Sequence, residues 1–230
     1  MADQPLALVT GASRGIGAAT ARALAPTHRL LLGGRDEQAL AGLARELPDA
    51  RPWPVDLTDP AALASAAAEC AELHVLVHSA GVARLGRVED SPAESWRHNL
   101  EVNVVAVAEL TRLLLPALRA AHGHVVLINS GQGLAAREGW GPYAASKFAV
   151  RAFADALRAE EEPHGVRVTS VYPGRTDTEM QQAVVAGEGG EYTPEKYLRP
   201  ESVAAAVHAA VSASPDAHLT EVTIRPRPNR

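Results

Sequence analysis

Lysine is scarce in this chain of 230 residues, which holds two lysines against twenty arginines. The single cysteine, Cys70, excludes an intramolecular disulfide framework, and the nine histidines show no spacing typical of a metal site. No uninterrupted apolar stretch reaches the ~18 residues of a membrane span, and no charged segment with a cleavage site marks a secretory signal. The sequence therefore predicts a cytoplasmic protein with no metal site and no membrane partner.

Basic residues are also fewer than acidic ones, so the formal net charge is −5. The chain has no basic stripe interleaved with aromatic residues, which argues against a nucleic-acid partner. With 47% hydrophobic and 21% charged residues, the composition is that of an ordinary globular protein. The length favours one α/β domain over residues 1–230.

Short apolar runs alternate with longer helical stretches along the chain. The runs predicted as strands are Pro5–Thr10, Arg29–Gly33, Arg51–Val55, Leu73–His78, His124–Ser130, Val166–Tyr172 and Leu219–Arg225. The predicted helices are Gly15–Ala25, Glu37–Leu47, Pro60–Ala71, Trp96–Ala121, Tyr143–Glu162 and a last one from near Glu201. This order predicts a doubly wound domain, with a seven-stranded parallel sheet and helices on both faces. The glycine-rich stretch within 178–200 is either a substrate lid or a disordered surface loop.

A glycine-rich turn follows the first predicted strand and opens the first helix, in the order Gly11-Ala-Ser-Arg-Gly15-Ile-Gly17. Glycines permit a tight turn and let backbone N–H groups approach a pyrophosphate at the helix N-terminus. A structural turn without a ligand is the alternative. In dinucleotide folds an acidic residue after the second strand selects the unphosphorylated ribose, but no carboxylate precedes Arg35 here. With Arg14 as a second cation, the sequence favours NADP(H) over NAD(H), unless Asp36 pairs with Arg35 at the surface.

Tyr143 and Lys147 are four residues apart, which places them on one face of a helix. A phenol with a pKa near ~10 exchanges protons poorly at neutral pH unless a neighbour lowers that value. A lysine ammonium is a compact point charge suited to that task. The alternative is a surface tyrosine beside a solvated lysine.

Taken together, these residues resemble the short-chain dehydrogenase/reductase family from about Pro5 to Arg225. The resemblance implies a Rossmann-like fold, a homodimer or homotetramer, and the catalytic set Asn103, Ser130, Tyr143 and Lys147. It implies cofactor contacts from Gly11, Ser13, Arg14, Gly15, Ile16, Gly17, Arg35, Asp56, Leu57, Ser79, Ala80, Gly81, Tyr143, Lys147, Pro173, Gly174, Thr176 and Thr178. The family's Asn-Ala-Gly reads Ser79-Ala80-Gly81 here, so the bonds of the missing amide need another source.

The expected activity is hydride transfer between NADP(H) and a small-molecule carbonyl or secondary alcohol. By the resemblance, Ser130 stabilises the carbonyl oxygen and Tyr143 moves the proton. Lys147 lowers the pKa of Tyr143 and holds the nicotinamide ribose, and Asn103 orients a water. Candidate pocket residues are Gln132, Arg137, Glu138 and Trp140. The alternatives are a ketoacyl thioester reductase, a dehydratase or epimerase, and a non-catalytic NADP(H)-sensing protein.

Overall fold

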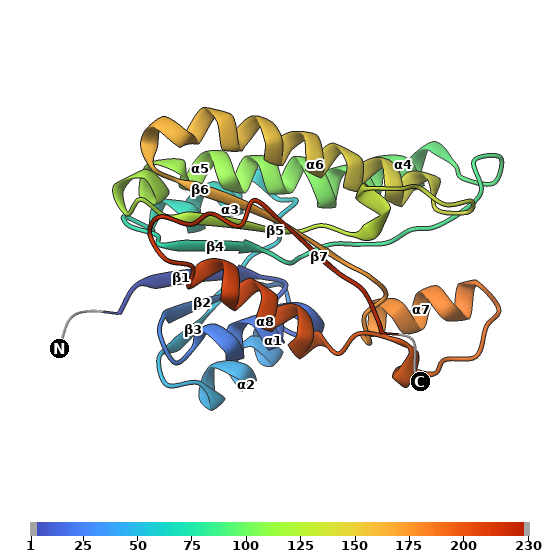
Figure 1. The fold of residues 1–230 in the computed structure, drawn as a ribbon, viewed down its shortest axis with the longest axis horizontal. Helices are drawn as coiled ribbons and strands as arrows, with labels where there is room; N and C mark the ends of the chain where they lie inside the picture. The colour runs from blue at the N-terminus through green and yellow to red at the C-terminus, as the bar shows by residue number, and fades with distance from the viewer. Residues whose placement is uncertain (1–3, 228–230) are drawn as a thin grey trace.

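Seven strands lie side by side in one parallel sheet in the computed structural model, which describes residues 4–227 (Figure 1). The first and last three residues of the expected 1–230 domain lie outside the described residues. The sheet has the order β3-β2-β1-β4-β5-β6-β7. The strands are β1 Leu6–Thr10, β2 Arg29–Gly34, β3 Ala50–Pro54, β4 Val75–His78, β5 His124–Ile128, β6 Arg167–Pro173 and β7 Glu221–Ile224. The predicted doubly wound, seven-stranded parallel fold is confirmed.

Helices cover both faces of the sheet. They are α1 Gly15–Leu24, α2 Glu37–Glu46, α3 Pro60–Ala68, α4 Ala93–Leu100, α5 Ala106–Ala120, α6 Gly141–Glu161, α7 Glu179–Gly187 and α8 Pro200–Val211. Figure 1 shows α4, α5 and α6 on one side of the sheet and α1, α2 and α8 on the other. Within β1, Leu8 packs in the core beneath α5, whereas its neighbours Ala7 and Val9 pack in the core beneath α1. This alternation explains why the strand is apolar throughout.

Two regions differ from the sequence prediction. The expected helix Trp96–Ala121 is divided, because a π-helical turn at Glu101–Val105 separates α4 from α5. The segment 178–200 contains the unpredicted helix α7, whose first turn is capped by the Thr178 hydroxyl accepting from the Gln181 N–H at 3.2 Å. Gly187 ends that helix rather than opening a loop. Whether this segment acts as a lid stays a prediction.

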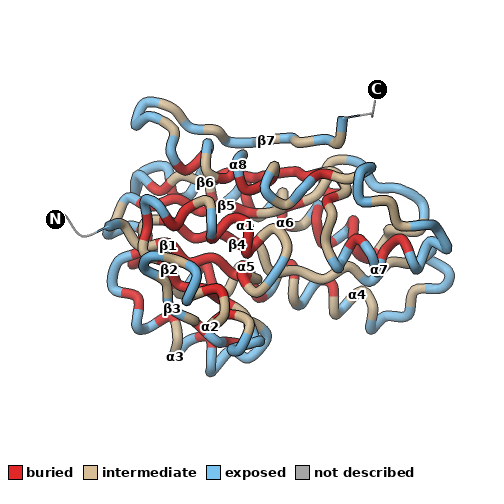
Figure 2. Tube along the Cα trace, turned by 90° about the horizontal axis from the view of Figure 1, so that it is seen from below, coloured by how far each residue is buried: buried red, intermediate tan, exposed pale blue. Residues whose placement is uncertain are grey.

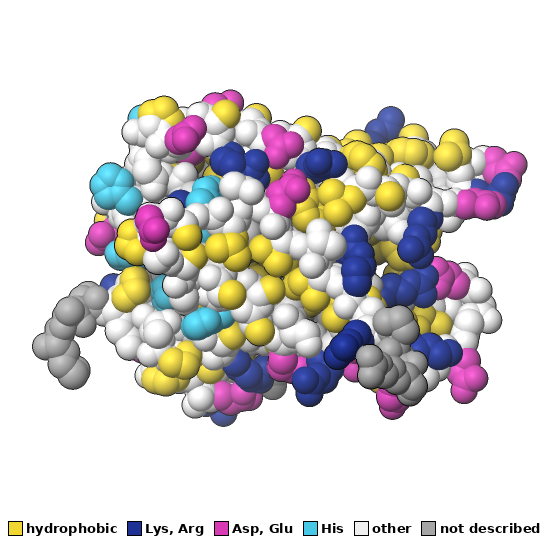
Figure 3. Space-filling view, in the orientation of Figure 1, with side chains coloured by type: hydrophobic (Ala, Val, Ile, Leu, Met, Phe, Trp, Pro, Cys, Tyr) yellow, Lys and Arg dark blue, Asp and Glu magenta, His cyan; other side chains and the backbone are white. Residues whose placement is uncertain are grey.

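The carboxyl ends of β1, β4, β5 and β6 meet at one edge of the sheet. Since the chain leaves β1 toward β2 on one side and β4 lies on the other, this edge contains the switch point where open α/β sheets bind ligands. On the face shown in Figure 3, Lys and Arg side chains gather where α7 meets the layer of α4 and α6. The outer strand β7 is only partly covered (Figure 2).

Neither a metal cluster nor a membrane span is found in the described part of the chain. Among residues 4–227, no group of three His, Cys, Asp or Glu side chains could hold a metal ion. None of the helices in that range is long and apolar enough to cross a membrane. The expected cytoplasmic location stays a prediction.

Because two histidines are buried, we expect the folded state to become less stable at acid pH. His78 bonds the Thr111 hydroxyl at 2.9 Å and His124 bonds that of Thr169 at 2.7 Å. Burial lowers the pKa of both to about 3. Because the unfolded side chain titrates near ~6.5, the unfolded state binds the extra proton between these values, and stability falls as the pH drops below ~6.5. Each histidine should cost about 2 kcal/mol of unfolding free energy at pH ~5.

Denaturant unfolding between pH ~7 and ~5 checks this expectation. We expect His124→Gln to reduce the pH slope of the unfolding free energy by about one proton, because its unfolded state no longer gains that charge. His164→Gln, at an exposed position, is the matched control and should keep the wild-type slope. An unchanged slope in His124→Gln would contradict the assignment.

Candidate active site

The four expected catalytic side chains come from three elements that meet at the carboxyl edge of the sheet. Asn103 lies in the π-helical turn, Ser130 follows β5, and Tyr143 and Lys147 lie on α6. The Ser130 hydroxyl partly opposes the rise in the pKa of Tyr143, and the Lys147 ammonium lies 5.8 Å from the centre of the Tyr143 ring. The structure therefore brings these three residues together, with Tyr143 and Lys147 buried and Ser130 partly exposed.

Lys147 is held between the end of β5 and the loop after β4. Its Nζ donates to the Ile128 carbonyl at 3.0 Å, and a side-chain carbon at Gly81 would lie 3.9 Å from it. Burial lowers the pKa of Lys147 to about 8. The ammonium is therefore mostly protonated at neutral pH and loses its charge under mildly alkaline conditions.

Tyr143 differs from the expectation in the direction of its pKa. Burial raises the pKa of the phenol, and the hydrogen bond with Ser130 opposes that rise by a smaller amount. The expected lowering by Lys147 is not seen, since burial is the main cause of the shift and Lys147 is not among its causes. In this arrangement Tyr143 keeps its proton at neutral pH, which suits a proton donor.

Asn103 connects the loop after β4 to α6. Its Oδ1 accepts from the Val82 N–H at 2.9 Å, and its Nδ2 donates to the Val82 carbonyl and to the Ser146 hydroxyl, both at 2.9 Å. A π-helical turn is often found at functional sites, and here it places this amide inside the fold. The water-orienting role of Asn103 stays a prediction.

Three positioning residues were missed by the sequence analysis. Asn129 accepts from the Ser130 N–H at 2.8 Å and donates to the Lys147 carbonyl at 3.1 Å, so it ties the end of β5 to α6. The Thr10 hydroxyl accepts from the N–H groups of Ser79 and Ala80, which supplies bonds after β4 without an asparagine at Ser79. The third is Ser146, the partner of Asn103. Thr10 and Asn129 could have been found from the sequence, because each is a polar residue at the end of an apolar strand.

The glycine turn is shaped for close approach of the backbone. Gly11 has a φ of 65°, and a side-chain carbon there would lie 2.8 Å from the Ala80 nitrogen. At Gly17 such a carbon would lie 2.1 Å from the Gly11 carbonyl oxygen. Aspartates cap α2 and α3, whereas α1 has no side-chain cap and no acidic residue in its first turn. This open, positive helix end fits the pyrophosphate of a dinucleotide.

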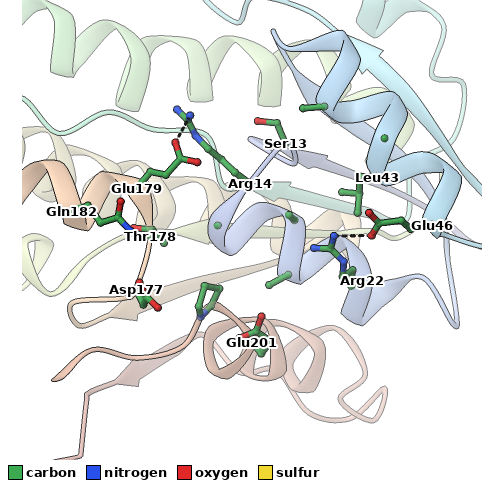
Figure 4. A pocket seen from close by; sticks show the side chains of 16 residues that line it. Ser13, Arg14, Arg22, Leu43, Glu46, Asp177, Thr178, Glu179, Gln182 and Glu201 are labelled. Carbon is green, nitrogen blue, oxygen red and sulfur yellow. Dashed lines mark hydrogen bonds and ion pairs between the residues drawn. The ribbon is translucent and has the colours of Figure 1, made fainter. Parts of the chain in front are cut away.

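Arg14 and Arg35, the two arginines expected near the cofactor's ribose, each lie beside a different carboxylate. Arg14 pairs with Glu179 of α7 at 2.6 Å (Figure 4), and Arg35 lies 4.0 Å from Asp56. Asp36 instead caps α2 by accepting from the Ala39 N–H, so the alternative pair with Arg35 does not form. Hydrogen bonds from Thr58 are the main cause of the lowered pKa of Asp56, and Arg35 contributes less.

Some of the residues that were expected to contact the cofactor line one or both of two cavities. One of about 460 Å³ lies between α1, α2 and the start of α7 (Figure 4) and is lined by Ser13, Arg14, Gly15 and Thr178 among others. The second, of about 420 Å³, is lined by Ser130, Tyr143, Ile16, Pro173, Gly174, Thr176 and Thr178 among others. Neither is lined by Asn103, Gly11, Gly17, Arg35, Asp56, Leu57, Ser79, Ala80, Gly81 or Lys147.

The expected pocket residues lie mostly where they were placed. Gln132, Arg137 and Trp140 line the second cavity, and the Trp140 ring packs edge-on against Tyr143 at 5.8 Å between centres. Glu138 does not line it, because its carboxylate is paired with Arg87. The segment 178–200 contributes the side chains of Met180, Gln181, Val184 and Lys196 to this cavity.

Comparison with known families and proteins supports the same interpretation. A family profile described as "short chain dehydrogenase" matches residues 5–189. The dehydrogenase/reductase SDR family member 7B of Bos taurus is 38% identical over 201 residues, which cover 80% of this chain. The match spans 62% of that relative's length, so this chain corresponds to only part of it.

Solved structures share the whole architecture. An alcohol dehydrogenase from the archaeon Thermococcus sibiricus, complexed with 5-hydroxy-NADP, superposes with a TM-score of 0.89 at 27% identity and covers 99% of both chains. A short chain dehydrogenase from Burkholderia cenocepacia, in complex with NADP, has a TM-score of 0.83 at 30% identity. That match covers 96% of this chain and 88% of the other.

Proposed function

Because this chain belongs to the short-chain dehydrogenase/reductase family of oxidoreductases, we propose that it transfers hydride between NADP(H) and a carbonyl or secondary alcohol. The observation that supports this most strongly is the cluster of Ser130, Tyr143 and Lys147, with Tyr143 and Lys147 buried, beside a cavity of about 420 Å³. Ser130 and Tyr143 both line that cavity, so both hydroxyls can reach one oxygen atom of a substrate.

Ser130, Tyr143 and Lys147 each have a separate role in carbonyl reduction. Ser130 donates a hydrogen bond to the substrate oxygen and stabilises the negative charge that develops there. Tyr143 gives its proton to the same oxygen, and Lys147 offsets the charge left on the phenolate. The nicotinamide, when bound, is the chemical source of the hydride that reaches the carbonyl carbon. Alcohol oxidation runs through the same contacts in reverse.

We assign the adenine end of the cofactor to the turn after β1 and the ends of β2 and β3. The uncapped amino end of α1 suits the pyrophosphate, and Arg35 suits a 2′-phosphate because its side chain is 78% exposed and only loosely paired with Asp56. The NADP complexes of the two structural neighbours support the same preference. The expected contacts of Asp56 and Leu57 with adenine, and of Pro173, Gly174 and Thr176 with the nicotinamide end, belong to this proposal.

A homodimer or homotetramer is also part of the proposal. Leu100, Val105 and Phe148 expose 37%, 51% and 41% of their surface on α4, the π-helical turn and α6. Apolar residues exposed on neighbouring elements are consistent with a surface covered by a second copy.

The charge of Lys147 predicts the alkaline limit of the reaction. Its lowered pKa of about 8 means that the ammonium is present below this pH and is lost above it. Without that charge the Tyr143 phenolate is less stable, so proton donation slows. We expect kcat for carbonyl reduction to be level between pH ~6 and ~7 and to fall by up to about tenfold per unit above ~8. A kcat that rises through pH ~9 would contradict this role.

A panel assay of NADPH consumption tests the proposal. The panel contains ketones, aldehydes, quinones, keto sugars and ketoacyl thioesters. We expect turnover with at least one carbonyl class, and a preference for ketoacyl thioesters would identify that alternative among the reductases. Tight NADPH binding without turnover of any carbonyl would instead favour the non-catalytic sensing alternative.

A further inference from the structure

The cavity beside Ser130 and Tyr143 has a charge opposite to that of the protein. Its lining contains the four cationic side chains Arg137, Arg175, Lys196 and Arg225 and no Asp or Glu. The chain as a whole has a formal charge of −5, so this local excess does not follow from composition.

One of the four cations is already neutralised. Arg175 is paired with Glu188, and its guanidinium lies 5.7 Å from the centre of the Trp140 ring. By contrast, within residues 4–227 no carboxylate lies at ion-pair distance from Arg137, Lys196 or Arg225. Three positive charges around this cavity therefore have no ion-pair partner in the described range.

Arg225 is the best positioned of these three. Its Nη1 donates to the backbone carbonyls of Tyr172, at 2.9 Å, and Ile224, at 3.2 Å, so the guanidinium is held in place without losing its charge. A side-chain carbon at Gly131, the residue after Ser130, would lie 3.3 Å from Nη2. The absence of a side chain at Gly131 therefore lets the guanidinium approach the reacting end of the cavity.

The cofactor does not account for these charges. The pyrophosphate is assigned to the amino end of α1, and the cation assigned to the 2′-phosphate is Arg35, which does not line this cavity. Arg225 directly follows β7, and Lys196 lies in the short helical turn at 194–196. The remaining lining includes the apolar side chains of Ala83, Trp140, Met180 and Val184, which suit an apolar body.

We propose that the substrate carries an acidic group, a carboxylate or a phosphate, joined to an apolar body, and that Arg225 binds the acidic group. Arg137 and Lys196 attract it at the edge of the cavity. A guanidinium fixed by backbone carbonyls suits such a group because it offers its remaining N–H donors without rearrangement. This inference rests on the proposed function, since it names the substrate class of the same site.

Matched substrate pairs test the inference. NADPH consumption is measured with straight-chain keto acids of increasing length, each beside its methyl ester, and with hydroxyacetone phosphate beside hydroxyacetone. We expect kcat/KM for the acidic member to exceed that of its neutral partner by about tenfold or more, and to fall with rising salt. The pair with the larger ratio distinguishes carboxylate from phosphate. Equal kcat/KM within every pair overturns the inference but leaves the reductase assignment intact.

Substitution of Arg225 tests whether this residue causes the preference for acidic substrates. Arg225→Gln should raise KM for the acidic substrate by about tenfold or more, with little change in kcat or in KM for the neutral partner. Arg45→Gln, an exposed arginine of α2 outside the cavity, is the matched control and should change neither value. Loss of NADPH affinity in Arg225→Gln with the acid preference retained would overturn the assignment.

A binding measurement keeps the inference testable if no panel carbonyl is turned over. Calorimetry with wild-type protein and NADP⁺ compares straight-chain hydroxy acids with their methyl esters. The acids should bind about tenfold more tightly or better, and Arg225→Gln should abolish the difference. Equal binding of acid and ester overturns the inference, whereas absent turnover with selective acid binding counts against the reductase assignment alone.

Discussion

Replacing Tyr143 with phenylalanine is expected to lower kcat for carbonyl reduction by about 10²–10⁴-fold, the range typical of a positioned proton donor. The substitution removes one oxygen atom and keeps the ring that packs against Trp140. Since the raised pKa keeps this phenol protonated, it is the cluster's proton source at neutral pH. NADPH affinity should change little, because the pyrophosphate and 2′-phosphate contacts are assigned elsewhere.

Steady-state kinetics and a direct NADPH titration check both halves of this expectation. Tyr172→Phe is the matched control, because it removes the hydroxyl of another buried tyrosine, one that bonds Glu221 and lies outside the cavity. It should keep its kcat. Normal turnover by Tyr143→Phe would show that another group supplies the proton.

The second large effect is expected at Arg35, where alanine should weaken NADPH binding by about 10–100-fold and leave NADH binding nearly unchanged. A hydrogen bond to a charged group contributes about 1.5–3 kcal/mol, which corresponds to that range. The contact with Asp56 is long and exposed, so its loss should cost little. Because Arg35 is exposed, raising the salt concentration should reduce the difference between the cofactors.

Titration of both cofactors against Arg35→Ala and Arg45→Ala measures this preference. The second variant removes an exposed arginine of α2, whose Nε donates to the Ala41 carbonyl, and should bind both cofactors like the wild type. Equal losses of NADPH and NADH in Arg35→Ala would remove the basis for a 2′-phosphate site.

The sequence was sufficient for features that depend on local pattern. Strands such as β1 are apolar throughout because both faces are covered, and the glycine turn stands between a strand and a helix. Tyr143 and Lys147 share a face of α6 because helical spacing requires it. Each of these features is determined by residues that are close together in the sequence.

Features made by distant segments could not be predicted. Arg225 reaches the cavity from the end of the sheet, and the contact of Arg14 with Glu179 joins α1 to α7. The raised pKa of Tyr143 follows from burial by surrounding elements, which spacing alone does not report. The π-helical turn at Asn103 interrupts a continuous apolar stripe that, read locally, predicts one long helix.

Transfer of deuterium is the most direct test of the central claim. The protein is supplied with NADPH deuterated at the reactive carbon of the nicotinamide and with its preferred carbonyl, and the product is analysed by mass spectrometry and NMR. We predict one deuterium on the carbinol carbon, formed by the wild type and nearly absent with Tyr143→Phe. Tight cofactor binding with no label in any alcohol product would contradict hydride transfer by this site.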